Sequence, residues 1–97
     1  MKFMLNWRVH EDKRHDALKG FSAMTPEDDM TDLGENIRLI GRWHDLAGFT
    51  GVAIFETDDP SAIAHWILNW NLILDAEVTL VLDDEETRKV GRARNPS

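Results

Sequence analysis

The sequence has no cysteine and no tyrosine, only three prolines, and few basic residues beside its many acidic ones. Without cysteine the chain can form no disulfide, no thiolate metal site and no cysteine nucleophile. No apolar run approaches the roughly 20 residues that a membrane helix needs. No basic segment with an apolar run precedes the first predicted strand, so the cytoplasm is the expected compartment.

The net charge of −7 also bears on the partners of the chain. Nucleic acids are bound through Lys and Arg that neutralise phosphates, so an acidic chain without a basic face is a poor nucleic-acid binder. The one basic cluster, at residues 88–94, falls near the expected end of a last helix, where the helix dipole favours cations. The 97 residues, 42% of them hydrophobic, predict a single globular domain over residues 1–97.

The hydrophobic pattern predicts an α+β fold. Alternating apolar and polar residues predict strands over residues 2–10, 36–44, 49–57 and 76–82. Helical periodicity predicts helices over 11–24 and 61–71, and capping signals predict short helices at 27–33 and 84–91. The order βαββαβ, with a hairpin joining the middle strands, is typical of the ferredoxin-like fold. Right-handed crossovers then give an antiparallel sheet of order 4-1-3-2 with both long helices on one face.

The other face of this sheet is expected to be uncovered. Strict alternation assigns to it a mixture of apolar and charged side chains, which is too apolar for a bare surface and too charged for a dry core. A second copy packed on this face, enclosing a partly polar cavity, satisfies both constraints, so a homodimer is expected. The residues assigned to this face are Met4, Asn6, Arg8, Ile40, Arg42, Thr79, Val81 and alternate residues of the third strand, Phe55 among the candidates.

Several motifs resemble one bacterial family. They are MKFMLNWRVH at the start, TPEDD, IRLIGRWHDL, FETDD, and WILNWN ahead of the last strand. The family that they resemble is classed only as a domain of unknown function with a ferredoxin-like fold, within the group called dimeric α+β barrels. The resemblance spans nearly the whole chain and implies the fold and a homodimer. It implies no reaction and no catalytic residues.

Polar side chains on the predicted strands form the candidate ligand site. An ion drawn into a half-buried interface is costly unless it is paired, so an Arg8–Glu77 ion pair that closes one end of the barrel is the favoured structural interpretation. The functional alternative is a positively charged pocket for a small carboxylate or other polar ligand. The candidate residues are Asn6, Arg8, His10, Arg42, His44, Trp66 and Glu77.

The placement of Asn6 and Trp66 is similar to that in haem-degrading and cofactor-free monooxygenases of the dimeric α+β barrel group. Aromatic residues at helical spacing are nevertheless more often core than cofactor site. The haem-binding members need a histidine soon after the second helix, and this sequence has none there, so no haem or other cofactor is expected. The histidines show no close ligand spacing, so no metal site is expected.

The expected function is therefore a small homodimer that binds a polar or aromatic metabolite between the sheet and the second helix. Two alternatives stay open. One is a cofactor-free monooxygenase or isomerase in which His10 or His44 carries a proton. The other is a structural interaction module with a filled barrel.

Overall fold

A computed structural model describes residues 1–95. It has four strands and four α-helices, with one short 3-10 helix after the first strand. Within these residues no helix is both long enough and apolar enough to cross a membrane. The elements, in chain order, are β1 (Lys2–Val9), η1 (Glu11–Lys13), α1 (Arg14–Ser22), α2 (Pro26–Leu33), β2 (Arg38–Asp45), β3 (Thr50–Glu56), α3 (Pro60–Leu68), β4 (Leu74–Val81) and α4 (Asp84–Arg94).

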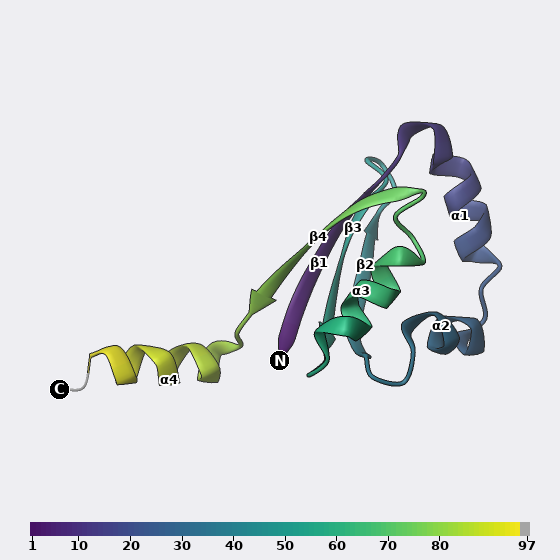
Figure 1. The fold of residues 1–97 in the computed structure, drawn as a ribbon. Helices are drawn as coiled ribbons and strands as arrows, with labels where there is room; N and C mark the ends of the chain where they lie inside the picture. Colours follow the sequence, from purple (N-terminus) through teal and green to yellow (C-terminus); the bar gives the residue numbers. More distant parts are fainter. Residues whose placement is uncertain (96–97) are drawn as a thin grey trace.

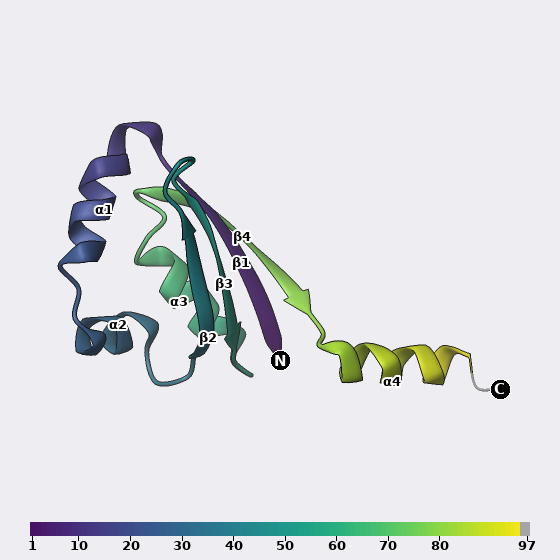
Figure 2. The same cartoon turned by 180° about the vertical axis from the view of Figure 1, so that it is seen from behind.

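The four strands form one antiparallel sheet in the order β2-β3-β1-β4. This order is the predicted 4-1-3-2 order read from the other edge, so the ferredoxin-like α+β fold is confirmed. Helices α1, α2 and α3 all lie on one side of the sheet, and we call that side the helix face (Figures 1 and 2). The opposite side, the open face, carries none of these three helices.

Local sequence signals explain where the helices begin. The Thr25 hydroxyl accepts a hydrogen bond from the amide of Asp28, whose carboxyl group accepts one from the amide of Thr25. Pro26 follows at the first helical position, where its missing N–H costs nothing. Asp59 and Pro60 start α3 in a similar way, since the Asp59 side chain accepts from the amide of Ser61.

The core lies between the helix face and α3. Phe55 is fully buried, stacks on Phe3 with ring centroids 5.6 Å apart, and meets the edge of Trp66 at 5.0 Å. Leu5 and Ala53 complete the sheet side of this cluster. Placing Phe55 among the candidates for the open face was therefore wrong, because it pairs with Phe3 and shares its face.

A bulge in β2 changes which side chains reach each face. Leu39 pairs with Phe55 but Gly41 pairs with Ile54, so one extra residue is inserted between them. Because side chains alternate along a strand, the extra residue sends every later side chain of β2 to the opposite face. Arg42 thus lies on the helix face beside Ala53, and the prediction that it belongs to the open face was wrong. His44 follows Arg42 to the helix face, and Trp43 points to the open face.

Candidate functional site

A pocket of about 110 Å³ lies between the helix face and helices α1 and α3. Its wall is almost entirely apolar and aromatic, with a few polar groups that come mainly from α1 and the β2–β3 hairpin. Such a wall with a small number of placed polar groups is the usual form of a small-molecule site. The apolar and aromatic lining residues are Leu5, Trp7, Val9, Ala17, Leu18, Phe21, Leu46, Phe49, Ala53, Trp66, Ile67, Trp70, Leu74 and Ala76.

Two arginines supply positive charge to this pocket. The guanidinium of Arg42 lies over the Phe21 ring at 4.9 Å and donates to Oδ2 of Asp29 at 2.8 Å. Arg14 lies over the Phe49 ring at 5.6 Å. Its Nε is buried and has no hydrogen-bond partner within residues 1–95. A buried donor without an acceptor costs about 1–3 kcal/mol, so the Nε of Arg14 is an unsatisfied donor of a residue that lines this pocket.

His44 lies beside these charges. Its ring meets Trp7 edge-on at 5.2 Å and Phe21 at 4.9 Å. Burial lowers the pKa of His44 below its ordinary value of 6.5, and the positive charge of Arg42 lowers it further. The imidazole is therefore neutral at pH 7 and can accept a proton or a hydrogen bond.

Backbone strain is found at the same pocket. Phe49, in the turn between β2 and β3, has φ of 51°, a left-handed conformation that is costly for a residue with a bulky side chain. The strained backbone aims the Phe49 ring toward α1, where it meets the His15 ring edge-on at 5.4 Å. Phe49 thus contacts two neighbouring residues of α1, Arg14 and His15.

Asp32 is a prominent polar residue that the sequence did not predict. From α2, its carboxyl group accepts hydrogen bonds from Nε1 of Trp66 at 3.0 Å and from Nε1 of Trp70 at 2.8 Å. The side-chain amide of Asn69 donates to it at 3.0 Å as well. Asp32 therefore ties α2 to Trp66 of α3 and to Asn69 and Trp70 just after this helix, and it orients two indoles that line the pocket.

The sheet separates the predicted site residues into two groups. Arg42, His44 and Trp66 line the pocket on the helix face, and His44 also borders the groove described next. Asn6, Arg8 and Glu77 belong to the open face, where an open groove also contains Trp43 and Val52. His10, just past the end of β1, contacts Asp75 with its Nε2 3.2 Å from Oδ1. One ligand therefore cannot touch all the predicted residues within one subunit.

The predicted Arg8–Glu77 ion pair does not form within residues 1–95 of the single chain. Glu77 lies opposite Asn6, and Arg8 lies opposite Asp75. Asn6 also lies on the opposite face from Trp66, so the likeness to monooxygenases that combine these two residue types does not extend to their positions in space. Within the same residues, no cluster of three His, Asp or Glu side chains is arranged to hold a metal ion.

Comparisons with known proteins identify a family but no activity. A family model described as a domain of unknown function, DUF3303, matches residues 1–95. No curated protein matches the chain. A solved structure titled as an uncharacterized NIPSNAP domain protein from Burkholderia xenovorans is similar, with a TM-score of 0.48 and 16% identity. The match covers 87% of this chain and 97% of that one. Because the family model matches nearly the whole chain, the chain belongs to the DUF3303 family.

Proposed function

We propose that this protein is a homodimer that binds a small aromatic carboxylate in the pocket on the helix face of each subunit. The observation that carries this proposal is the combination, in one apolar pocket, of an arginine Nε that is buried without a partner and a second arginine beside it. A carboxylate offers Arg14 the acceptor that it lacks, and the aromatic wall accepts a ring.

The size of the pocket limits the ligand. A dry cavity of about 150 Å³ is known to bind benzene, and this pocket of about 110 Å³ is open on one side. One six-membered ring fills such a space, and its polar substituent then lies toward the opening. A larger metabolite would extend out of the pocket, so a single ring with a short acidic side chain is the ligand class that fits best.

Local charges, more than the net charge of the chain, act on an anion in the pocket. Arg14, Arg42 and one acidic residue, Asp45, line it, and the Asp45 carboxyl group accepts from the amides of Ala47 and Gly48. The net charge of −7 repels an anion at long range, but charges farther away than about 8 Å are largely screened at physiological salt. Within the pocket Arg42 is already neutralised by Asp29, whereas Arg14 has no acidic partner at 4 Å or less among residues 1–95. Arg14 is thus the main anchor, with Arg42 as a supporting charge.

The open face supports the homodimer part of the proposal. Trp43 is 59% exposed and Ile40 is 45% exposed, although both are large apolar side chains. They lie on the side of the sheet with half-buried Val52, Ile54 and Val81, which none of α1, α2 and α3 covers. An exposed apolar surface of this kind marks an interaction site. A second copy would remove it from water and leave both pockets accessible on the outer sides.

Intrinsic fluorescence tests ligand binding directly. Trp7, Trp66 and Trp70 line the pocket, and Trp43 does not. Benzoate is expected to change the emission with saturation on the order of 1 mM or below, which corresponds to about 4 kcal/mol for a ligand of this size. Benzamide, which has nearly the same shape and no charge, should bind at least tenfold more weakly.

Two matched variants locate the anchor. Arg14→Gln should remove the preference for benzoate over benzamide. Arg38→Gln, a change of the same kind on the open face, should leave that preference intact. Equal binding of the two ligands to the unmodified protein, or no saturable change up to 10-fold above the expected concentration, would refute the proposed ligand class.

An isomerase-like enzyme is a second candidate, and the position of His44 favours it. A neutral imidazole with a lowered pKa in the pocket can take a proton from a bound molecule, whereas His10 lies outside the pocket and contacts Asp75. Proton exchange from phenylacetate into deuterated water, followed by NMR, is the test. Exchange that is lost in His44→Gln while binding persists would establish catalysis, and equal exchange in both proteins would exclude it.

A further inference from the structure

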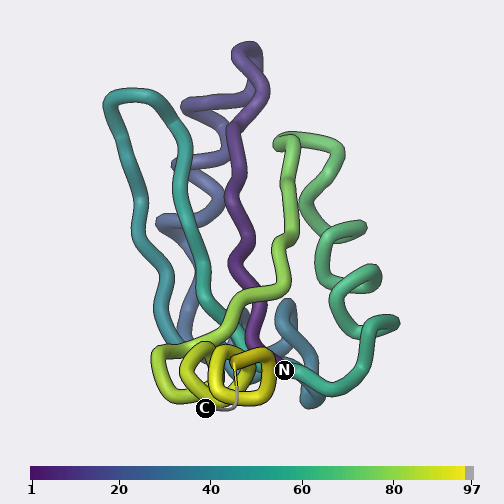
Figure 3. The backbone as a smooth tube through the Cα atoms, turned by 90° about the vertical axis from the view of Figure 1, so that its left-hand side faces the viewer, coloured from purple at the N-terminus to yellow at the C-terminus, as the bar shows by residue number. Residues whose placement is uncertain are grey.

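The last helix, α4, projects away from the rest of the domain. Figures 1 and 2 show it leaving the end of β4 and extending beyond the open face, on the side opposite the other helices. Figure 3 views the molecule from the side on which α4 projects, and α4 is seen there nearly along its own axis. The described chain measures 55 × 29 × 19 Å and has a radius of gyration of 15.8 Å. A compact chain of this length would have about 12.5 Å.

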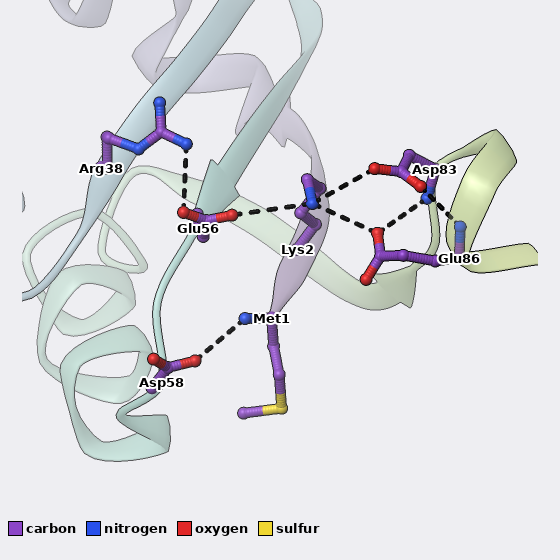
Figure 4. Close-up of polar contacts among 7 residues, drawn as sticks. All are labelled: Met1, Lys2, Arg38, Glu56, Asp58, Asp83 and Glu86. Atoms are coloured by element: carbon purple, nitrogen blue, oxygen red, sulfur yellow. Dashed lines mark hydrogen bonds and ion pairs between the residues drawn. The ribbon is translucent and has the colours of Figure 1, made fainter. Parts of the chain in front are cut away.

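A network of ion pairs holds the base of α4. Nζ of Lys2, on the first strand, lies 3.2 Å from Glu86, 3.5 Å from Asp83 and 3.7 Å from Glu56 (Figure 4). The Asp83 side chain also accepts from the amide of Glu86, which caps the helix. The network thus joins α4 to the sheet at its first turn, which directs the rest of the helix outward.

Beyond this base, α4 has little to stabilise it within its own subunit. Its side chains are exposed apart from that of Glu86, including Val90 at 53%. An isolated helix of 11 residues is marginal in water, and its side-chain pairs, such as Arg92 with Glu85 at 3.0 Å, are exposed ones. A helix that is anchored at one end and otherwise unpacked is suited to contact another molecule.

The charge of α4 is complementary to that of α2. The first turn of α4 is acidic, but its second half is basic, with Arg88, Lys89, Arg92 and Arg94. Helix α2 is acidic and contains no Lys or Arg within Pro26–Leu33, and Glu35 follows it. Helix α2 and the base of α4 lie toward the same end of the sheet (Figures 1 and 3).

The geometry of a face-to-face dimer brings these helices together. Packed sheets lie about 10 Å apart, and a helix of 11 residues is about 16 Å long. The base of α4 lies at the ends of the middle strands, beside Lys2 of β1 (Figure 3). From there α4 is long enough to pass the plane of a facing sheet, so the long side chains of its basic half can reach toward the helix layer behind that sheet. A two-fold axis parallel to the strands keeps the corresponding strand ends of the two copies together. Helix α2 of the partner lies toward that same end.

We propose that α4 is an intersubunit arm whose basic half packs on the acidic helix α2 of a second copy. This inference rests on the homodimer of the proposed function. It adds a partner surface for α4 and explains why a projecting helix with a basic end occurs in an acidic chain. The arm would clasp the partner beyond the sheet-to-sheet contact.

Charge reversal with rescue tests the arm. Sedimentation equilibrium should show a dimer dissociation constant at least tenfold higher for the α4 variant Lys89→Glu/Arg94→Glu. The same increase is expected for the α2 variant Glu27→Lys/Glu35→Lys. When all four changes are combined, the constant should return to within threefold of the unmodified value. Far-UV circular dichroism checks that the helices persist. Glu11→Lys/Asp16→Lys, the same charge change as in α2 but at the opposite end of the sheet, should leave the constant unchanged.

The outcomes separate the arm from the dimer itself. An intact dimer that responds to neither reversal, or a loss that the combined variant does not restore, would overturn the arm and leave the sheet-to-sheet dimer standing. A monomeric unmodified protein would overturn both. Tighter association after removal of residues 84–97 would show that α4 folds back on its own open face, which contradicts the arm. Benzoate binding, measured on the same samples, reports on the pocket separately.

Discussion

Replacing Asp32 with alanine should destabilise the protein strongly. The substitution removes the acceptor for Nε1 of Trp66, Nε1 of Trp70 and the amide of Asn69. Trp66 is only 5% exposed, so its indole N–H is left without an acceptor at a cost of about 1–3 kcal/mol. Water can reach Trp70 and Asn69, which reduces their share to about 0.5 kcal/mol each. The expected loss is therefore about 3 kcal/mol.

This loss is large for a chain of this size. A domain of about 100 residues is stable by roughly 5–15 kcal/mol, and each 1 kcal/mol lowers its melting temperature by about 4–8 °C. Asp32→Ala should thus melt about 12–24 °C lower than the unmodified protein. Asp32→Asn keeps one acceptor oxygen, so it should lose about half as much free energy. Asp12→Ala, an exposed acidic residue in η1, should change the stability by less than about 0.5 kcal/mol.

Urea denaturation followed by far-UV circular dichroism is the suitable assay. Tryptophan fluorescence is less suitable, because loss of the neighbouring Asp32 carboxyl group would change the emission of Trp66 and Trp70 even in the folded protein. All variants should be compared at one protein concentration, because the stability of the proposed dimer would depend on it. A loss below 1 kcal/mol for Asp32→Ala would show that the tryptophans find other acceptors. The account of how α2 is joined to α3 would then be refuted.

Three further predictions concern charge and the open face. Burial and Arg42 lower the pKa of His44, so the unfolded chain binds a proton at this residue more readily than the folded protein does. The free energy of unfolding, measured in urea, should therefore fall as the pH drops below about 6.5, and His44→Gln should lack this loss. Hydrogen bonds from Arg38 to Glu56 and from the backbone of Glu86 to Asp83 lower the pKa values of both acids, so their contributions to stability are present above pH 4.5 and are lost as the pH falls below 3.8. Helicity at about pH 2.5 should therefore decrease in the unmodified protein, and it should decrease less in Lys2→Met. Trp43→Lys should raise the dimer dissociation constant about 30-fold in sedimentation, as expected for an aromatic anchor, and an unchanged constant would exclude the open face as the interface.

The fold could be predicted because its signals are local. Alternation in the strands, the capping residues Thr25, Asp59 and Asp83, and the hairpin between β2 and β3 each depend on a few neighbouring residues. The order of the strands then follows from the handedness of the crossovers. The helix after the first strand differs in detail, since Glu11–Lys13 forms a 3-10 turn before α1 begins at Arg14.

The candidate site was predicted less well, and one bulge is the main reason. Simple alternation placed Arg42 on the open face, but the extra residue near Gly41 turns Arg42, and His44 after it, to the helix face. A glycine inside a strand is a signal for a bulge, so Gly41 could have prompted this interpretation. The prediction kept strict alternation instead, and it joined Asn6 and Arg8 with Arg42 in one site.

The role of Asp32 could not be predicted from local patterns. It lies in an acidic stretch where capping and solvation explain most carboxyl groups, and its donors are 34 or more residues later in the chain. Arg14 was likewise not among the predicted site residues, whereas it lines the pocket and has a buried Nε. Both contacts depend on how α1, α2 and α3 pack, which the sequence pattern alone does not specify.

A crystal structure of the protein grown with benzoate tests the central claim most directly. We expect the ring in the pocket between the helix face and helices α1 and α3, with a carboxylate oxygen within hydrogen-bond distance of Nε of Arg14. A ring bound only in the groove of the open face, or a pocket that stays empty at millimolar benzoate, would contradict the proposed function.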